Sequence, residues 1–319
     1  MPTSAAGAAA LGGSAPLPVY TAATVAMDTL VAVHVAAHLP SPEIAKAAQR
    51  ALAWFRVVED VTSRFDEASE AMRCGRQPGR PVRVSPLLAQ LMEFALTLAQ
   101  RSSGAFDPTV GRTLELRGFN QHYVTGRRVE STMPAGGVSY RDVALDRRRG
   151  TITVRRPMVV DLSAVAKGLA IDLAARELAP LGDFVVEAGG DLYVSGAHPE
   201  GRPWRIGVRH PFEPERVLCR LAAHGLAICT SGNYERVAAD GSGHLVDPRD
   251  SGAPCDLASV TVLAPTAMAA DGLATAAFVL GAEAGPRLLE DEGAHGVFYT
   301  ASLARFTTRN FPFPLEDAH

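Results

Sequence analysis

The segment DLSAVAKGLAID, residues 161–172, decides how the centre of this chain folds. Most of its residues are Ala, Leu, Val or Ile, which is typical of a helix that is buried rather than exposed. Ser at position 163 is a favourable residue for starting a helix near Ala164. The segment nevertheless carries one acidic residue at its start, Asp161, and one basic residue, Lys167, directly before a glycine.

These two charged residues allow two interpretations. The start of a helix offers free N–H groups to an anion, and Lys167 could add a positive charge for a phosphate or a carbonyl group. Alternatively, Asp161 and Lys167 form a buried ion pair, which is costly unless both groups are well satisfied. The segment alone leaves both interpretations open.

The flanking sequence predicts an α+β fold. Residues 41–65 and 85–104 have apolar residues at helical spacing, and each begins at a Ser-Pro pair. Residues 266–281 predict a third helix that ends at Gly281. Short β-branched segments predict strands at 29–37, 150–162 (around a turn), 183–196 (around Gly-Gly), 204–210, 227–232 and 257–265. Because strands and helices alternate irregularly, an α+β arrangement is favoured over a doubly wound sheet.

Length and composition predict one large domain. The chain has 319 residues, of which 47% are hydrophobic and 20% charged. A net charge of −3 argues against broad nucleic-acid binding. The arginines at 147–149 and 155–156 are interpreted as solvated turns and strand ends. The four cysteines form no C-x-x-C pair, so neither a zinc site nor a disulfide framework is predicted.

The N-terminal segment differs from the rest. Residues 1–22 are rich in small residues and are predicted to be disordered, which leaves residues 23–319 as the domain. The segment lacks the basic and apolar regions of a secretory signal, and no apolar run reaches transmembrane length. A cytoplasmic protein is therefore the expectation.

Two further patterns could carry chemistry. Asp271 and Thr275 stand one helical turn apart, which places a carboxylate and a hydroxyl on one face. Such oxygens suit Mg²⁺, although a lone Asp could instead cap or bond a neighbouring loop. His244 precedes Asp247-Pro248 and is a possible general base, although a lone His is more often structural.

The order of the motifs points to a family. The segments MDT (27–29), GAFDPTVG (104–111), DLSAVAKGLAID (161–172), EAGGDLYVSG (187–196), TSGNYER (230–236), HLVDPRDSG (244–252) and ADGLATAAFVLG (270–281) together resemble the ApbE family. The resemblance spans about residues 25–310. It implies a single α+β domain of mixed and antiparallel sheets flanked by helices, with FAD in a central cleft.

The resemblance also implies an activity. Members of this family are Mg²⁺-dependent FAD:protein FMN transferases: they split the FAD pyrophosphate, join FMN through a phosphoester to a Thr or Ser hydroxyl of an acceptor protein, and release AMP. The acceptor carries a motif that resembles D-G-x-S/T-G-A-T, which this chain does not contain. Two alternatives remain: a Mg²⁺-dependent pyrophosphatase that makes FMN and AMP, and a non-catalytic FAD-binding protein. Many members of the family are exported lipoproteins, so the resemblance implies a periplasmic or membrane-associated location as the alternative to a cytoplasmic one.

Site residues follow from the matching motif positions. The metal would be held by the Ala164 carbonyl, Asp271 and Thr275, and His244 is the expected general base. Gly168 would let the following turn pack closely. The residues expected to contact FAD are Met27, Phe65, Ala105, Phe106, Asp107, Asp161, Lys167 and Val246.

Two departures from the family pattern stand near this set. Asp28 occupies a position where the family usually has Gly. Ala274 stands where some members carry a second acidic metal ligand. Its absence would leave one metal site of low charge, or a site that depends on the FAD phosphates to complete it.

Overall fold

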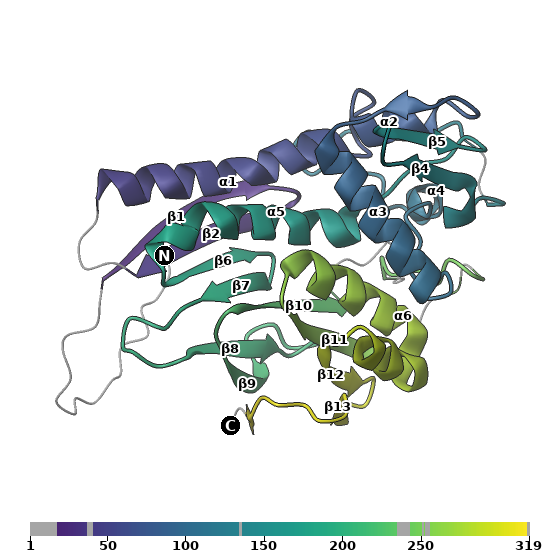
Figure 1. Ribbon diagram of the computed structural model, residues 1–319. Coiled ribbons are helices and arrows are strands. Elements are labelled where there is room, and N and C mark those ends of the chain that lie inside the picture. The colour runs from purple at the N-terminus through teal and green to yellow at the C-terminus, as the bar shows by residue number, and fades with distance from the viewer. Residues whose placement is uncertain are drawn as a thin grey trace.

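The computed structural model describes residues 18–36, 41–133, 136–234, 243–250, 252 and 256–317. Its centre is an eight-stranded antiparallel sheet in the order β1-β2-β6-β7-β10-β11-β12-β13 (Figure 1). The strands are β1 (Val19–Ala26), β2 (Thr29–Ala36), β6 (Phe184–Ala188), β7 (Asp191–Ser195), β10 (Leu226–Gly232), β11 (Leu257–Ala264), β12 (His295–Thr300) and β13 (Arg305–Thr307).

Three long helices cover one face of this sheet. Helix α1 (Pro42–Thr62) packs on β1 and β2, α5 (Ser163–Leu178) on β6 and β7, and α6 (Ala267–Asp291) on β10, β11 and β12. Helix α3 (Pro86–Arg101) contacts all three, and the short helices α2 (Glu70–Gly75) and α4 (Gly111–Leu116) lie near it. Helices segregated to one face of an antiparallel sheet make an α+β fold, as predicted.

The other face of the sheet carries a second, smaller core. Along each strand, successive side chains point to opposite faces. Val186 therefore faces the helices while Val185 belongs to the smaller cluster, which is closed by Trp204. That cluster is covered by a three-stranded sheet of β14 (Leu315–Asp317), β9 (Val217–Ala223) and β8 (Trp204–Arg209).

A third sheet stands beside α2 and α3. Its strands are β3 (Val82–Arg83), β5 (Thr151–Val154) and β4 (Val143–Asp146), in that order. Two strands were predicted within residues 150–162, and only the first of them forms. The residues after the turn make separate hydrogen bonds to loops and helix ends instead: the Met158 N–H donates to the Gly75 carbonyl at 3.1 Å, and the Asp161 N–H donates to the Pro108 carbonyl at 2.8 Å.

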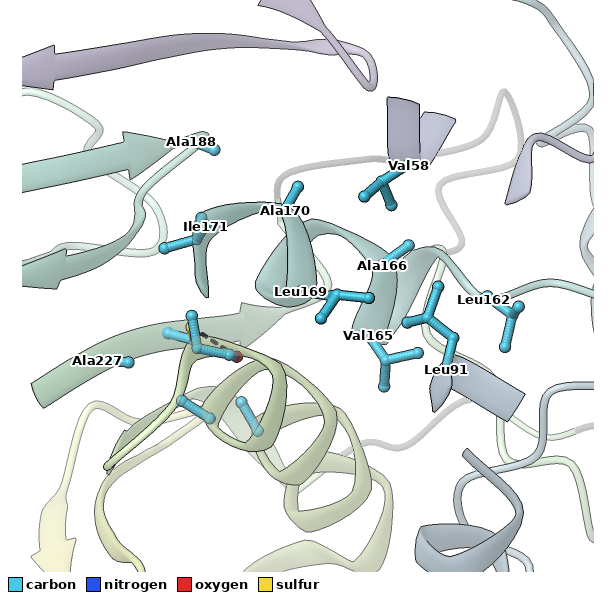
Figure 2. Packing of buried hydrophobic residues seen from close by; sticks show 14 of the residues in the cluster. Val58, Leu91, Leu162, Val165, Ala166, Leu169, Ala170, Ile171, Ala188 and Ala227 are labelled. Carbon is cyan, nitrogen blue, oxygen red and sulfur yellow. Dashed lines mark hydrogen bonds between the residues drawn. The ribbon is translucent and has the colours of Figure 1, made fainter. Parts of the chain in front are cut away.

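Helix α5, formed by the segment that opened the sequence analysis, is buried over most of its surface, with Ser163 and Arg176 exposed near its ends. Figure 2 shows Ala166 lying toward Val58 of α1 and Val165 on the opposite side of the helix. A helix that is apolar all round forms the core of a protein. The predicted cap is wrong in detail, because Ser163 is the first helical residue and not the cap.

The other element boundaries agree with the sequence with two corrections. Ser41 and Ser85 cap α1 and α3, as their Ser-Pro signals predicted. Strand β1 begins at Val19, so the domain extends into the predicted disordered segment, of which residues 1–17 lie outside the described part. Gly281 (φ 78°) does interrupt α6, but the helix resumes and continues to Asp291.

Helix α6 owes its apolar character to its place in the core. Within the described residues it is the one helix whose length and composition would suit a membrane span, and 61% of its apolar window is buried inside the protein. Its buried residues pack on β10 and β11 and against α5.

Candidate active site

The predicted site residues all line one cavity of about 240 Å³. It lies where the N-terminal turn of α5 meets the end of α1, the β1–β2 turn and the start of α6. The residues that were predicted separately and that converge here are Met27, Phe65, Ala105, Phe106, Asp107, Asp161, Ala164, Lys167, His244, Val246, Asp271 and Thr275. The structure thus supports their membership of one site, while the role of each stays a prediction.

A buried charge cluster occupies one wall of the cavity. The Lys167 ammonium forms an ion pair with Asp191 and lies 3.3 Å from Asp271 Oδ2. The Gly168 N–H donates to the same oxygen at 3.1 Å. The alternative of an Asp161–Lys167 pair is therefore wrong, because Lys167 pairs with two other carboxylates that are distant in sequence.

Asp161 instead organises the first turn of α5. Its Oδ1 accepts the Ser163 N–H at 2.9 Å and the Ser163 hydroxyl at 2.6 Å, and its Oδ2 lies 2.7 Å from Arg64 Nε. The Arg64 side chain is mostly buried, its guanidinium lies 4.3 Å from the centre of the Phe65 ring, and it donates to the Phe119 carbonyl. Sequence analysis missed Arg64, and only its proximity to the aromatic residue at 65 could have indicated it.

Asp271 and Thr275 lie on one face of α6, as their spacing predicted. Burial raises the pKa of the Asp271 carboxyl, and the nearby Lys167 ammonium opposes that rise. Thr275 Oγ1 lies 3.2 Å from Ser231 Oγ on β10. The Gly168 N–H, which an α-helix normally assigns to the Ala164 carbonyl, is engaged by Asp271. Ala164, Asp271 and Thr275, the three residues of the predicted metal set, line the same cavity.

The donor set fits a hard cation with few protein ligands. Among the described residues, no three His, Cys, Asp or Glu side chains gather as a metal cluster. A carboxylate, a hydroxyl and a backbone carbonyl are the oxygen ligands that Mg²⁺ accepts, with water and substrate phosphates completing its shell. The Lys167 ammonium lies 3.3 Å from Asp271 Oδ2, so a cation bound here would share this carboxylate with Lys167.

Two residues of the 161–172 segment, Gly168 and Asp172, fix the position of α6 relative to α5. Asp172, at the far end, accepts the Ala267 N–H at 2.7 Å and the Met268 N–H at 3.0 Å, which caps α6. A Cβ on Gly168 would lie 2.3 Å from the Ala267 carbonyl oxygen. Gly168 therefore permits the close packing that was predicted, and the segment that supplies Lys167 also fixes the helix that supplies Asp271.

The β1–β2 turn borders the cavity in an unusual conformation. Met27 (φ 52°) and Asp28 (φ 62°) both adopt the left-handed region, which matches the mirror-image turns of tight hairpins. Asp tolerates this region, but Met does so at a cost that is usual at functional sites. The Asp at 28, a departure from the family pattern, is thus compatible with the turn.

The AFD element lies in a rigid loop. Asp107 Oδ1 accepts hydrogen bonds from the Thr109 N–H at 2.9 Å and from the Thr109 hydroxyl at 2.7 Å. Asp107 Oδ2 accepts the Tyr140 N–H at 2.9 Å. Burial raises the pKa of the Asp107 carboxyl, and these hydrogen bonds oppose the rise. Both carboxylate oxygens are engaged within the protein, so Asp107 at least shapes the loop that presents Ala105 and Phe106.

His244 and Val246 reach the cavity from the loop after β10. The His244 ring lies edge-on to Phe119, with ring centroids 6.2 Å apart, and Val246 is buried. Asp247 accepts the Arg249 N–H at 2.9 Å, and its own N–H donates to the Gly252 carbonyl at 3.1 Å. Asp247 thus closes the loop that carries His244.

Sequence analysis missed an aromatic cluster at the mouth of the cavity. The rings of His122 and Tyr123 stack 5.3 Å apart, and Phe65 meets His122 edge-on at 5.8 Å. These residues also line an adjoining open groove with Arg56 and Arg127. The loop that carries His122 and Tyr123 matches no motif, so only its aromatic content could have indicated it.

Comparison with known proteins places the chain in a family. The model of the ApbE family matches residues 27–298. A protein of Rhodobacter capsulatus named FAD:protein FMN transferase is 36% identical over 72% of this chain and 45% of its own length. One of the same name from Haemophilus influenzae is 32% identical over 70% of both chains. The chain thus spans less than half the length of the first of these relatives.

Solved structures agree with this result. The crystal structure of an ApbE protein from Thermotoga maritima superposes with a TM-score of 0.80 at 30% identity, over 92% of this chain and 98% of that one. The flavin transferase ApbE from Vibrio cholerae gives a TM-score of 0.79 at 25% identity, over 93% and 100%. The chain belongs to the ApbE family.

Proposed function

We propose that this protein is a FAD:protein FMN transferase, which joins FMN from FAD to a Thr or Ser hydroxyl of an acceptor protein through a phosphoester and releases AMP. One observation carries the proposal: residues predicted from motifs spread between Met27 and Thr275 line a single cavity. The curated relatives with this name are enzymes, and their similarity extends over most of the chain.

The metal in this proposal is Mg²⁺, held by Asp271, Thr275 and the Ala164 carbonyl. It would supply positive charge that neutralises the pyrophosphate and makes its phosphorus more electrophilic. Because Ala274 supplies no second carboxylate, the site has low negative charge of its own, and FAD phosphates would contribute to it.

The chain's own residues orient the substrate. Lys167 enters the cavity beside Asp271, where its ammonium would bind a pyrophosphate oxygen as a point charge. Phe65, His122 and Tyr123 offer flat aromatic faces to the ring systems of FAD. Phosphoryl transfer depends mainly on such positioning and charge stabilisation.

His244 would accept the proton of the attacking hydroxyl. It lines the same cavity as Asp271 and Thr275, and it sits in a loop that Asp247 and Asn233 hold in place. The Leu245 N–H donates to Asn233 Oδ1 at 2.9 Å, which fixes the residue next to His244. Imidazole is the usual general base near neutral pH.

The test uses the pure protein, FAD, Mg²⁺ and a peptide with the D-G-x-T-G-A-T motif. We expect peptide fluorescence from bound flavin and an equal amount of AMP, both abolished by EDTA. AMP with free FMN and no labelled peptide would instead establish the pyrophosphatase. Bound FAD without AMP would establish a binding protein.

A further inference from the structure

Asp191 is a buried carboxylate in the cavity to which no role has been assigned. It is the first residue of β7, directly after the Gly189-Gly190 turn, and is 3% exposed. One of its oxygens accepts the Thr230 N–H at 2.9 Å, and the other forms the ion pair with Lys167. Both oxygens therefore have defined partners, of which one is the ammonium that reaches the active site.

The charges around Lys167 do not cancel, because one ammonium faces two carboxylates. Lys167 lies between Asp191 and Asp271, so the three groups carry a net charge of −1. A divalent cation bound by Asp271 would stand close to the Lys167 ammonium and repel it. In a site of low dielectric, such a repulsion acts strongly over a few ångströms. Lys167 then needs another anion if it is to stay in the cavity.

Asp191 is well placed to be that anion. It is fixed by its position in the sheet, because β7 pairs with β10 at Leu192↔Ile228 and Tyr193↔Ala227. The Thr230 N–H holds its carboxylate from the neighbouring strand, and Thr230 in turn bonds Thr261 through their hydroxyls at 2.9 Å. The carboxylate therefore cannot move far when the charge nearby changes.

We propose that Asp191 is a positioning residue that keeps the Lys167 ammonium in the cavity when a divalent cation binds Asp271. This inference rests on the metal role proposed for Asp271 and Thr275. Without the cation, Lys167 has two carboxylate partners. With the cation on Asp271, Asp191 is the carboxylate of this pair that still holds Lys167. The ammonium then stays in the cavity, in position to contact the FAD pyrophosphate.

The test is FAD binding by Asp191→Asn, measured from flavin fluorescence with and without saturating Mg²⁺. Asn keeps the size of the side chain and an oxygen that can accept the Thr230 N–H, so only the charge is lost. We expect the Kd for FAD at saturating Mg²⁺ to rise about tenfold, with little change in the absence of Mg²⁺. Because Mg²⁺ is saturating, a change in the Kd for FAD does not reflect a change in metal affinity. Metal affinity itself is measured separately, from Mn²⁺ binding by electron paramagnetic resonance.

A second variant shows whether Asp191 acts through Lys167. In a Lys167→Met background, Asp191→Asn should add no further loss of FAD affinity, because there is no ammonium to hold. Glu177→Gln is the matched control and should leave the Kd for FAD unchanged. Glu177 is on α5, the helix that carries Lys167, but it pairs with Arg50 at 3.0 Å and lies outside the cavity lining. Asp191→Glu keeps the charge and should retain most of the affinity, and it replaces the Asn variant if that variant does not fold.

The outcomes are distinct. An equal Kd for wild type and Asp191→Asn at saturating Mg²⁺ overturns the inference, as does an equal loss with and without Mg²⁺. A loss that persists in the Lys167→Met background overturns it too. If FAD binding by the wild type does not respond to Mg²⁺ or Mn²⁺, the metal site itself is wrong and the inference falls with it.

Discussion

Individual residues matter here because three carboxylates of the cavity, Asp161, Asp191 and Asp271, are buried and each has a positively charged partner. Asp271 is the residue whose loss tests the metal site most simply. In Asp271→Asn, the amide oxygen can still accept the Gly168 N–H, which the carboxylate accepts at 3.1 Å. A neutral amide is a much weaker ligand for Mg²⁺. We expect Mg²⁺-dependent FAD turnover to fall at least about 100-fold while the fold is kept, measured by AMP release and circular dichroism. Full Mg²⁺-dependent turnover by this variant would show that the metal is held elsewhere.

His244 offers an independent prediction. His244→Ala should lower the rate of FMN transfer by about 100-fold or more, because a positioned general base contributes on that scale. FAD affinity should change little, since the residue is proposed to act on the acceptor hydroxyl. Rates come from labelled peptide and affinity from flavin fluorescence. A variant with normal transfer rates would place the base at another residue.

The sequence predicted these individual residues better than their partners. Motif positions identified Asp271, Thr275 and Lys167, because each stands within a recognisable local pattern. The pairing of Lys167 with Asp191 and of Asp161 with Arg64 could not be predicted, because it joins segments brought together only by the sheet and by α1. Asp191 had one signal, its place directly after two glycines, and that signal equally fits an ordinary hairpin.

At the scale of elements, the contact between α5 and α6 decides whether the site forms. Gly168→Ala places a methyl group 2.3 Å from the Ala267 carbonyl oxygen, at the start of the helix that carries Asp271. Backbone atoms cannot move aside as a side chain can. We expect a loss of about 1–3 kcal/mol in the free energy of unfolding, although Ala is the better helix former.

Gly272→Ala is the comparison for this prediction. A Cβ at Gly272 would first meet the flexible end of Leu98, at 2.8 Å, so its cost should be smaller. Urea unfolding of both variants measures the difference. If Gly168→Ala is as stable as the wild type, or more stable than Gly272→Ala, the close approach of α5 and α6 is not needed.

Element prediction from the sequence was correct where a start signal and a periodic pattern coincided. Helices α1 and α3 had both, and the strands on either side of Gly189-Gly190 were marked by that turn. It failed for residues 158–162, where Val159 and Val160 are buried in a segment that forms no strand. It also failed beyond Gly281, where Asp256 Oδ2 accepts the Ala282 N–H at 2.8 Å and restarts the helix from a distant segment.

For the whole molecule, two cores share one sheet, and the larger core encloses reactive groups. Burial raises the pKa of the Cys229 thiol well above its ordinary value and that of Cys74 to about 11. At pH 8 only about 0.1% of Cys74 would be thiolate, the form that reacts. We expect iodoacetamide to leave both thiols unlabelled in the native protein, as measured by peptide mass spectrometry. Labelling in urea should rise together with global unfolding, whereas labelling of Cys229 in native buffer at the rate of a free thiol would contradict a closed core.

The strand order is the part of the fold that the sequence could not predict. Strand β2 pairs with β6, and the chain between them forms the helices α1 to α5 and a separate small sheet. Strand pairing over such a distance depends on which apolar faces fit, and no local pattern records it. The α+β class could be predicted from the irregular alternation of helices and strands, whereas the central cleft could be predicted only from the family resemblance.

The most direct measurement is the intact mass of an acceptor protein bearing the D-G-x-S/T-G-A-T motif after incubation with this protein, FAD and Mg²⁺. The proposed function predicts a mass increase equal to FMN less one water molecule. Fragmentation should place that increase on the Thr or Ser of the motif, with one AMP released per label and no label with Asp271→Asn. An unmodified acceptor together with free FMN and AMP would contradict transfer and establish hydrolysis.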